Sequence, residues 1–191
     1  MINKSFLAFL LLCSVVFISP CRADEGDLSV GGSFGGVGLT GTGMNQYGAN
    51  GFGYGGYITY SPSNMFDMDV NLTYSPHSNG ANSSNLFYST IGLRTGIKFD
   101  QLLPFLTAGV GIYRSSVQLG GVSDSAASFG FNVGGGLDID LSKWFRMGLL
   151  IRYHPVFSKA ISTGANGVDD LWDVLFRVGV LFRTGTQGGW D

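Results

Sequence analysis

The 191-residue sequence predicts an all-β protein, an eight-stranded antiparallel up-and-down transmembrane β-barrel. Three observations predict this fold. Eight stretches alternate between large apolar residues and small or polar ones, as strands with one apolar face do. An apolar segment at the N-terminus indicates export from the cytoplasm. The connections between the eight stretches alternate between short and long, which is typical of outer-membrane barrels.

The first 23 residues are interpreted as a cleaved secretory signal peptide. Lys4 supplies a positive charge, Phe6–Ile18 is almost wholly apolar, and the small residues Cys21 and Ala23 precede the expected cut. The apolar run is shorter than the ~20 residues that a membrane-spanning helix needs. A membrane anchor and a lipoprotein cut before Cys13 or Cys21 are the alternatives. We expect a signal peptide at 1–23, a barrel at 24–184 and a short tail at 185–191.

Composition limits the chemistry of the exported chain. Cleavage removes both cysteines, so we expect no disulfide and no cysteine-ligated metal. It also removes Lys4 and Arg22 but no acidic residue, which leaves 9 basic and 13 acidic residues. This balance does not suggest a nucleic-acid partner. We expect no cofactor.

The first four expected strands are Leu28–Gly38, Gly51–Ser61, Met65–Ser75 and Leu86–Phe99. The first is glycine-rich and the least regular, whereas the second sets Ile58 against Thr59 and the fourth sets Leu93 against Arg94. The third is the most regular, with Asp, Asn or Thr between large apolar residues. We expect its apolar face to meet lipid through Phe66, Met68, Val70, Leu72 and Tyr74.

The last four expected strands are Pro104–Arg114, Ser128–Leu141, Trp144–His154 and Leu171–Thr184. All four alternate Phe, Ile, Leu, Val, Met or Tyr with glycine, small polar residues or charges. Each of the eight runs is about as long as a tilted strand that crosses a bilayer. Short connections are expected at Pro62–Asn64, Asp100–Leu103 and Ser142–Lys143. Long polar loops are expected at Leu39–Asn50, Pro76–Asn85, Ser115–Ala127 and Pro155–Asp170.

The apolar faces could pack against each other in a soluble sandwich or face lipid in a barrel. Aromatic residues near the strand ends, such as Tyr60, Phe99, Phe145 and Trp172, favour lipid, because aromatic girdles mark membrane interfaces. Glycine recurs on the opposite face, and an eight-stranded barrel has little room inside. The short connections then mark the periplasmic end, and the long loops lie outside the cell.

Charged residues on the inner face form a predicted constellation, because a buried charge is tolerated only when it is paired. Neighbouring antiparallel strands place opposite charges at similar depth. We expect Asp67 and Asp69 to lie against Arg94 and Lys98. The remaining members of this expected lumen ion-pair network are Asp138, Asp140, Arg146, Arg152 and Arg177. The network either plugs and stabilises the barrel or gates a narrow pore.

The pattern of eight strands and the last strand together resemble a known family. Arg177, Gly179 and Phe182 are spaced like the C-terminal signal that the barrel-assembly machinery reads, although Thr184 replaces a second aromatic residue. The chain resembles the eight-stranded outer-membrane β-barrel family, which includes the transmembrane domain of outer-membrane protein A and outer-membrane protein X. The resemblance implies a monomer integral to the bacterial outer membrane, in contact with lipid and lipopolysaccharide, with Gly179 and Phe182 as its assembly signal.

The sequence favours a non-enzymatic structural or surface-interaction role, with unknown surface ligands for the loops. A narrow gated pore for small solutes or ions is the alternative. A lipid-modifying hydrolase is a third possibility, because His154 and Ser158 lie near Asp169, Asp170 and Asp173 in the sequence. The two histidines, His77 and His154, are too far apart in the sequence to suggest a metal site.

Overall fold

The fold is described from a computed structural model of the chain, which describes residues 25–40, 49–63, 65–80, 82–119, 121–157 and 170–183. The expected signal peptide at 1–23 and tail at 185–191 lie outside these residues. In the described part of the chain, no helix has the length and apolar character needed to cross a membrane.

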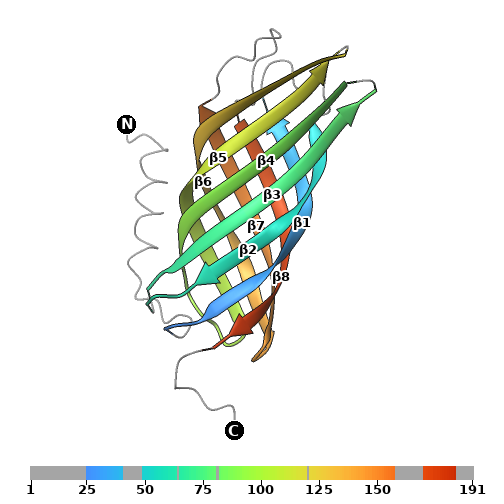
Figure 1. Cartoon of the computed structure of the whole chain (residues 1–191). Helices are drawn as coiled ribbons and strands as arrows, with labels where there is room; N and C mark the ends of the chain where they lie inside the picture. Colours follow the sequence, from blue (N-terminus) through green and yellow to red (C-terminus); the bar gives the residue numbers. More distant parts are fainter. Residues whose placement is uncertain are drawn as a thin grey trace, which may run out of the picture.

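Eight antiparallel strands close into a barrel (Figure 1). Each strand pairs with the next one along the chain, and the last pairs with the first through thirteen residue pairs, from Leu28 with Phe182 to Thr40 with Asp170. The strands are β1 (Leu28–Thr40), β2 (Asn50–Tyr60), β3 (Asp67–Asn79), β4 (Asn82–Gly96), β5 (Leu102–Leu119), β6 (Val122–Ser142), β7 (Phe145–Phe157) and β8 (Asp170–Phe182). The expected fold class is therefore confirmed.

The apolar faces of the strands lie outside the barrel, as the alternation predicts for a membrane protein. On β3, Asp69, Asn71 and Thr73 are buried, whereas Val70 and Leu72 are exposed. A soluble sandwich would have the opposite distribution. Closure also pairs both edges of every strand, so the transmembrane backbone needs no water for its hydrogen bonds. The sandwich alternative is therefore wrong.

Two of the four expected long loops are largely strand. β3 and β4 continue to Asn79 and Asn82, and β5 and β6 continue to Leu119 and Val122. Two-residue connections join each pair, with Gly80 at φ 62° and Gly121 at φ 89°, a backbone conformation that glycine adopts without strain. These segments were expected as loops because Ser, Asn and Gly obscure a dyad pattern. Above a membrane neither face has to be apolar, so the alternation that marks the other strands is lost.

The barrel has two ends that differ in their connections. At the lower end in Figure 1, β1 begins and β8 ends, and this end holds the connections between β2 and β3, β4 and β5, and β6 and β7. At the upper end, the β3–β4 and β5–β6 hairpins extend furthest. The expected loops at Leu39–Asn50 and Pro155–Asp170 fall mostly on residues that are not described.

Inside the barrel, the side chains lie in three layers. Charged and polar side chains dominate the lower and middle lumen, where Leu150 and Leu175 are also fully buried. A cluster of apolar side chains lies in the upper lumen, together with the buried Ser75 and His77, which differs from the uniformly polar interior expected from the sequence. We call this upper layer the apolar seal; its members are Val37, Leu39, Leu86, Val117, Val156 and Leu171. The sequence pattern did not reveal it because the inward faces mix aliphatic residues, such as Leu171 and Leu175, with polar and charged ones.

Candidate functional site

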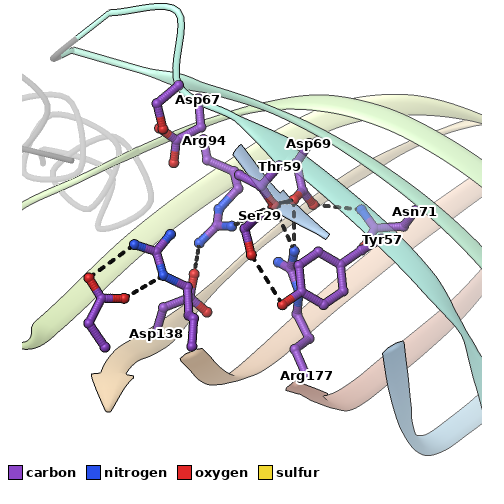
Figure 2. Close-up of polar contacts among 12 residues, drawn as sticks. Ser29, Tyr57, Thr59, Asp67, Asp69, Asn71, Arg94, Asp138 and Arg177 are labelled. Carbon is purple, nitrogen blue, oxygen red and sulfur yellow. Dashed lines mark hydrogen bonds and ion pairs between the residues drawn. The ribbon is translucent and has the colours of Figure 1, made fainter. Parts of the chain in front are cut away.

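The lower polar layer joins five strands across the lumen (Figure 2). We define it as Thr59, Asp69, Arg94, Asp138 and Arg177. Asp69 Oδ1 lies 2.9 Å from Arg177 Nη2 and 3.5 Å from Arg94 Nη1. Arg94 Nη2 lies 2.5 Å from Asp138 Oδ2. Thr59 Oγ1 donates to Asp69 and accepts from Arg177 at 2.9 Å. The two carboxylates and two guanidinium groups therefore neutralise one another in the interior.

Two aromatic rings and an amide complete the surroundings of this layer. The guanidinium carbon of Arg94 lies 3.6 Å from the centre of the Phe105 ring, and that of Arg177 lies 3.7 Å from the centre of the Tyr57 ring. An aromatic face attracts a cation most strongly where water is excluded. Asn71 Nδ2 donates to the second oxygen of Asp69 at 2.6 Å. Arg94, only 2% exposed, is thus held from several sides.

Of the other charged residues expected in the network near the lower end of the barrel, some have partners in the lumen and one, Lys98, does not join it. Arg146 binds Asp140 through Nε at 2.6 Å and Nη2 at 3.2 Å, and Arg183 binds the same carboxylate at 3.0 Å. Asp67 is buried opposite Arg94 in the strand register and accepts a hydrogen bond from the Ser61 hydroxyl at 2.8 Å. The structure does not bring Lys98 into the network. It follows the end of β4, is only partly buried, and has no ion pair with a described carboxylate.

The upper polar layer is centred on Asp173, a fully buried carboxylate. We define the layer as Tyr88, Tyr113, Arg152, His154 and Asp173. Arg152 donates to both oxygens of Asp173, from Nη2 at 2.7 Å and Nε at 3.2 Å, and its Nη1 donates to Thr90 at 3.0 Å. The Tyr88 hydroxyl donates to Asp173 Oδ2 at 2.8 Å. Asp173 on β8 thus accepts hydrogen bonds from Tyr88 on β4 and from Arg152 on β7.

Many of these contacts join strands that are not neighbours in the sheet. Arg177 on β8 binds Asp69 on β3, and Tyr88 on β4 binds Asp173 on β8. Contacts of this kind pass through the interior instead of along the wall. They therefore occupy the lumen at two heights, below the apolar seal, and they fix opposite walls of the barrel to each other.

His154 belongs to the upper polar layer and not to a surface catalytic group. It is 0% exposed; its Nε2 lies 3.2 Å from Asp173 Oδ2 and its Nδ1 lies 2.8 Å from the Tyr113 hydroxyl. Both ring nitrogens therefore have partners within the barrel. Ser158 and Asp169 lie outside the described residues, and the Asp170 carboxylate accepts from the Tyr153 hydroxyl. His77 contacts the Ser75 hydroxyl at 3.0 Å.

Metal binding finds no support in the described ranges. No group of three or more histidine, cysteine, aspartate or glutamate side chains is arranged there to hold a metal ion.

The residues expected to face lipid are on the outer wall. Phe66 precedes β3, and Met68, Val70 and Leu72 follow on its exposed face. Tyr74 is partly buried: its hydroxyl donates to Asn85 Oδ1 at 2.9 Å, and its ring lies edge-on to Tyr54. Its place near the upper end matches a tyrosine at a membrane interface, where one end of the side chain is apolar and the other is polar.

Gly179, one of the two expected assembly-signal residues, has a structural role in the lumen. It faces inward, and a Cβ atom there would lie 2.3 Å from the Tyr57 hydroxyl oxygen and 2.9 Å from the Val30 carbonyl oxygen. Phe182 is exposed on the outer wall at the end of β8, opposite Leu28. The sequence pattern could not distinguish a recognition signal from this steric requirement.

Gly179→Ala is expected to lower the free energy of unfolding by about 1–3 kcal/mol, because the added methyl group overpacks the lumen. Refolding of purified chain into lipid vesicles, followed by the heat-modifiable gel band, measures this without any assembly machinery. Adding Tyr57→Phe removes the nearest atom and should recover part of the loss. Wild-type refolding of Gly179→Ala would instead leave recognition as the reason for glycine at this position.

Comparison with known proteins agrees with this geometry. The family described as outer membrane protein beta-barrel domain matches residues 7–183. The sequence matches no curated protein. Among solved structures, neisserial surface protein A is 17% identical, with a TM-score of 0.65 over 82% of this chain and 98% of that chain. OprG from Pseudomonas aeruginosa is 15% identical, with a TM-score of 0.62 over 87% and 100%. Ail of Yersinia pestis, in complex with the heparin analogue sucrose octasulfate, is 14% identical, with a TM-score of 0.56 over 83% and 100%.

Proposed function

The chain belongs to the outer membrane protein beta-barrel family and is an integral protein of the bacterial outer membrane, and we propose that it acts there as a closed, non-enzymatic barrel with a structural or surface-interaction role. The observation that carries this proposal is the content of the lumen. Two polar layers and the apolar seal are stacked along the axis, and each layer contains side chains from strands on several sides of the barrel.

The alternative is a narrow gated pore, in which the ion pairs act as the gate. Opening such a pore through the lower polar layer would separate Arg94 from Asp138 and Arg177 from Asp69. Breaking a buried ion pair so that one charge remains unpaired costs about 3–5 kcal/mol. A path through the barrel would also have to displace the apolar seal. These combined costs favour the closed barrel.

The same geometry supports a non-enzymatic role. His154 is enclosed below the apolar seal, and its two nitrogens are bonded to Asp173 and Tyr113. In a Ser–His arrangement, one histidine nitrogen must reach the nucleophile, and both nitrogens of His154 have other partners. The partners that we infer are lipid and lipopolysaccharide around the barrel, the barrel-assembly machinery during insertion, and a surface ligand above it. Ail, a barrel of this fold, was solved with a heparin analogue, which is consistent with a surface-interaction role. We infer a monomer with a cleaved signal peptide at 1–23, a barrel at 24–184 and a tail at 185–191.

Single-channel recording in planar lipid bilayers tests the proposal. The unmodified protein is expected to give no stable openings, because the lumen is closed at three heights. A variant with Arg94→Ser and Arg177→Ser, which removes both guanidinium groups of the lower polar layer, is also expected to stay closed, because the upper polar layer and the apolar seal remain. Its folding is checked by heat modifiability before recording. Stable openings of the unmodified protein that are lost in Arg94→Ala or Arg146→Ala would establish the pore instead.

A further inference from the structure

On one flank of the barrel, the outward side chains change from apolar to cationic and then to uncharged polar between the lipid-facing wall and the upper rim. The flank is formed by the outward faces of β4, β5 and β6, which extend together at the upper end in Figure 1. The strand register aligns its side chains in rows of directly paired residues across the three strands, which we call rungs. The lowest of these contains Ile112 and Phe129, which pair directly and are 63% and 47% exposed. Both are suited to acyl chains.

The next rung upward introduces a single cation. Phe87 pairs with Arg114, and Arg114 pairs with Ala127. Phe87 and Arg114 are both exposed on the outer wall. Arg114 thus lies one outward position above Ile112, between a phenylalanine and an alanine. An arginine at this height places a planar guanidinium group at the boundary between acyl chains and headgroups, where it can bind a phosphate with two parallel hydrogen bonds.

The two rungs above Arg114 contain only hydroxyl and amide side chains. Asn85 pairs with Ser116, which pairs with Ser125, and Ser83 pairs with Gln118, which pairs with Ser123. These six residues, together with Val117 and Asp124, line a groove of about 350 Å³. The Tyr74 hydroxyl donates to Asn85 Oδ1 at 2.9 Å, which directs the Asn85 amino group away from Tyr74. The groove therefore offers hydrogen-bond donors and acceptors next to each other.

We propose that this flank binds the phosphorylated glycolipid of the outer leaflet, lipopolysaccharide, with acyl chains on Ile112, Phe87 and Phe129, a phosphate on Arg114 and core sugars in the serine- and amide-lined groove. The proposal rests on the outer-membrane location and on the surface-interaction role. A sugar hydroxyl both donates and accepts, as the Ser, Asn and Gln side chains do. Asp124 pairs with Val117 of the apolar seal, so it belongs to the inner face of β6, and the outward groove side chains are uncharged. The cation for the phosphate is therefore Arg114, one rung below the groove.

The order of the rungs is what distinguishes this site from an ordinary lipid-exposed wall. An annular lipid contact requires only an apolar belt with aromatic ends. Here the same three strands add a cation and then two polar rungs, in the order acyl chain, phosphate and sugar that a glycolipid presents from the membrane outward. The groove is also continuous with the lipid-facing wall below it, so a molecule anchored in the leaflet reaches it without leaving the membrane.

The test titrates the full-length mature protein, folded in detergent, with fluorescent lipopolysaccharide that carries core sugars and with lipid A that lacks them. The unmodified protein is expected to bind the core-bearing molecule about tenfold more tightly, since two or more net hydrogen bonds of about 0.5–1.5 kcal/mol separate the two ligands. Asn85→Leu with Ser116→Val should abolish that difference and leave lipid A binding unchanged. Arg114→Gln should weaken the binding of both ligands.

The matched control is Asn50→Leu, which removes an exposed outward amide near the upper end of β2, on another part of the wall. It should keep the tenfold preference. Gln118→Leu, further from the membrane, serves as a second groove variant if the double variant fails the heat-modifiability check. The inference would be overturned if the unmodified protein bound the two ligands equally. It would also be overturned if Asn50→Leu reduced the preference for core-bearing lipopolysaccharide as much as the groove variants do.

Bilayer recordings on the same preparation separate this inference from the proposed function. A closed barrel without preference for core sugars overturns the glycolipid site alone. A conducting barrel that retains the preference overturns the closed-lumen proposal alone.

Discussion

Asp173→Asn is expected to lower the free energy of unfolding by about 3–5 kcal/mol, the cost of breaking a buried ion pair while one charge remains. Asp173 is fully buried and accepts from Arg152, Tyr88 and His154. Asparagine keeps the shape but removes the negative charge. The Arg152 guanidinium, only 2% exposed, would then have no described carboxylate to pair with.

Equilibrium unfolding by urea in lipid vesicles, monitored by tryptophan fluorescence, measures this loss. Asp170→Asn is the matched control, because it makes the same change three residues earlier on β8. Asp170 accepts from Tyr153 at an exposed site, so the expected loss is about 1 kcal/mol or less. Similar losses for the two variants would contradict the assignment of Asp173 as the centre of the upper polar layer.

A double variant distinguishes loss of the pair from exposure of a lone charge. Arg152→Met with Asp173→Leu removes both charges and keeps most of the side-chain volume. Replacing a whole buried pair by apolar residues is often neutral or stabilising. The double variant is therefore expected to be more stable than Asp173→Asn. A double variant whose loss equals or exceeds the sum of the two single losses would show that packing and not charge governs this layer.

The strand pattern predicted most of the fold from physical rules that act locally. Alternation fixes which face of a strand each residue occupies, so the number of strands, their order and the lipid-facing wall followed from the sequence. The upper halves of the β3–β4 and β5–β6 hairpins could not be predicted in this way. Their outward faces are polar and their inward faces mix polar and apolar residues, so no regular hydrophobic alternation separates Pro76–Asn85 or Ser115–Ala127 from a loop.

The interior contacts were less predictable than the inward faces. Sequence reasoning paired charges between adjacent strands, and the structure does pair Arg146 with Asp140. However, Asp138 binds Arg94 two strands away, and Asp69 is shared by Arg94 and Arg177. Long guanidinium side chains reach across a narrow lumen, so strand adjacency does not determine the partner. Asp173 was not expected in the ion-pair network, because its contact with Arg152 beneath the apolar seal was not visible in the sequence.

Leu171→Ala, in the apolar seal, is expected to lower the free energy of unfolding by about 2–5 kcal/mol. Leu171 is fully buried on the inner face of β8, two residues above Asp173, and it packs with Leu86 and Val156. Alanine removes apolar contacts and leaves a cavity. The surrounding strands are held in the barrel ladder and cannot collapse to fill it. The same urea titration in vesicles measures the loss.

Leu72→Ala on β3 makes the same chemical change on the outer wall, where Leu72 is 48% exposed. Lipid chains are fluid and fill the space that alanine leaves, so only the smaller transfer cost remains, about 1 kcal/mol. The difference between the two variants isolates the cavity cost inside the barrel. If Leu171→Ala lowers the free energy of unfolding no more than Leu72→Ala does, fluid lipid or water already reaches the upper lumen. The apolar seal would then not close the barrel, and the two polar layers alone would have to block ions.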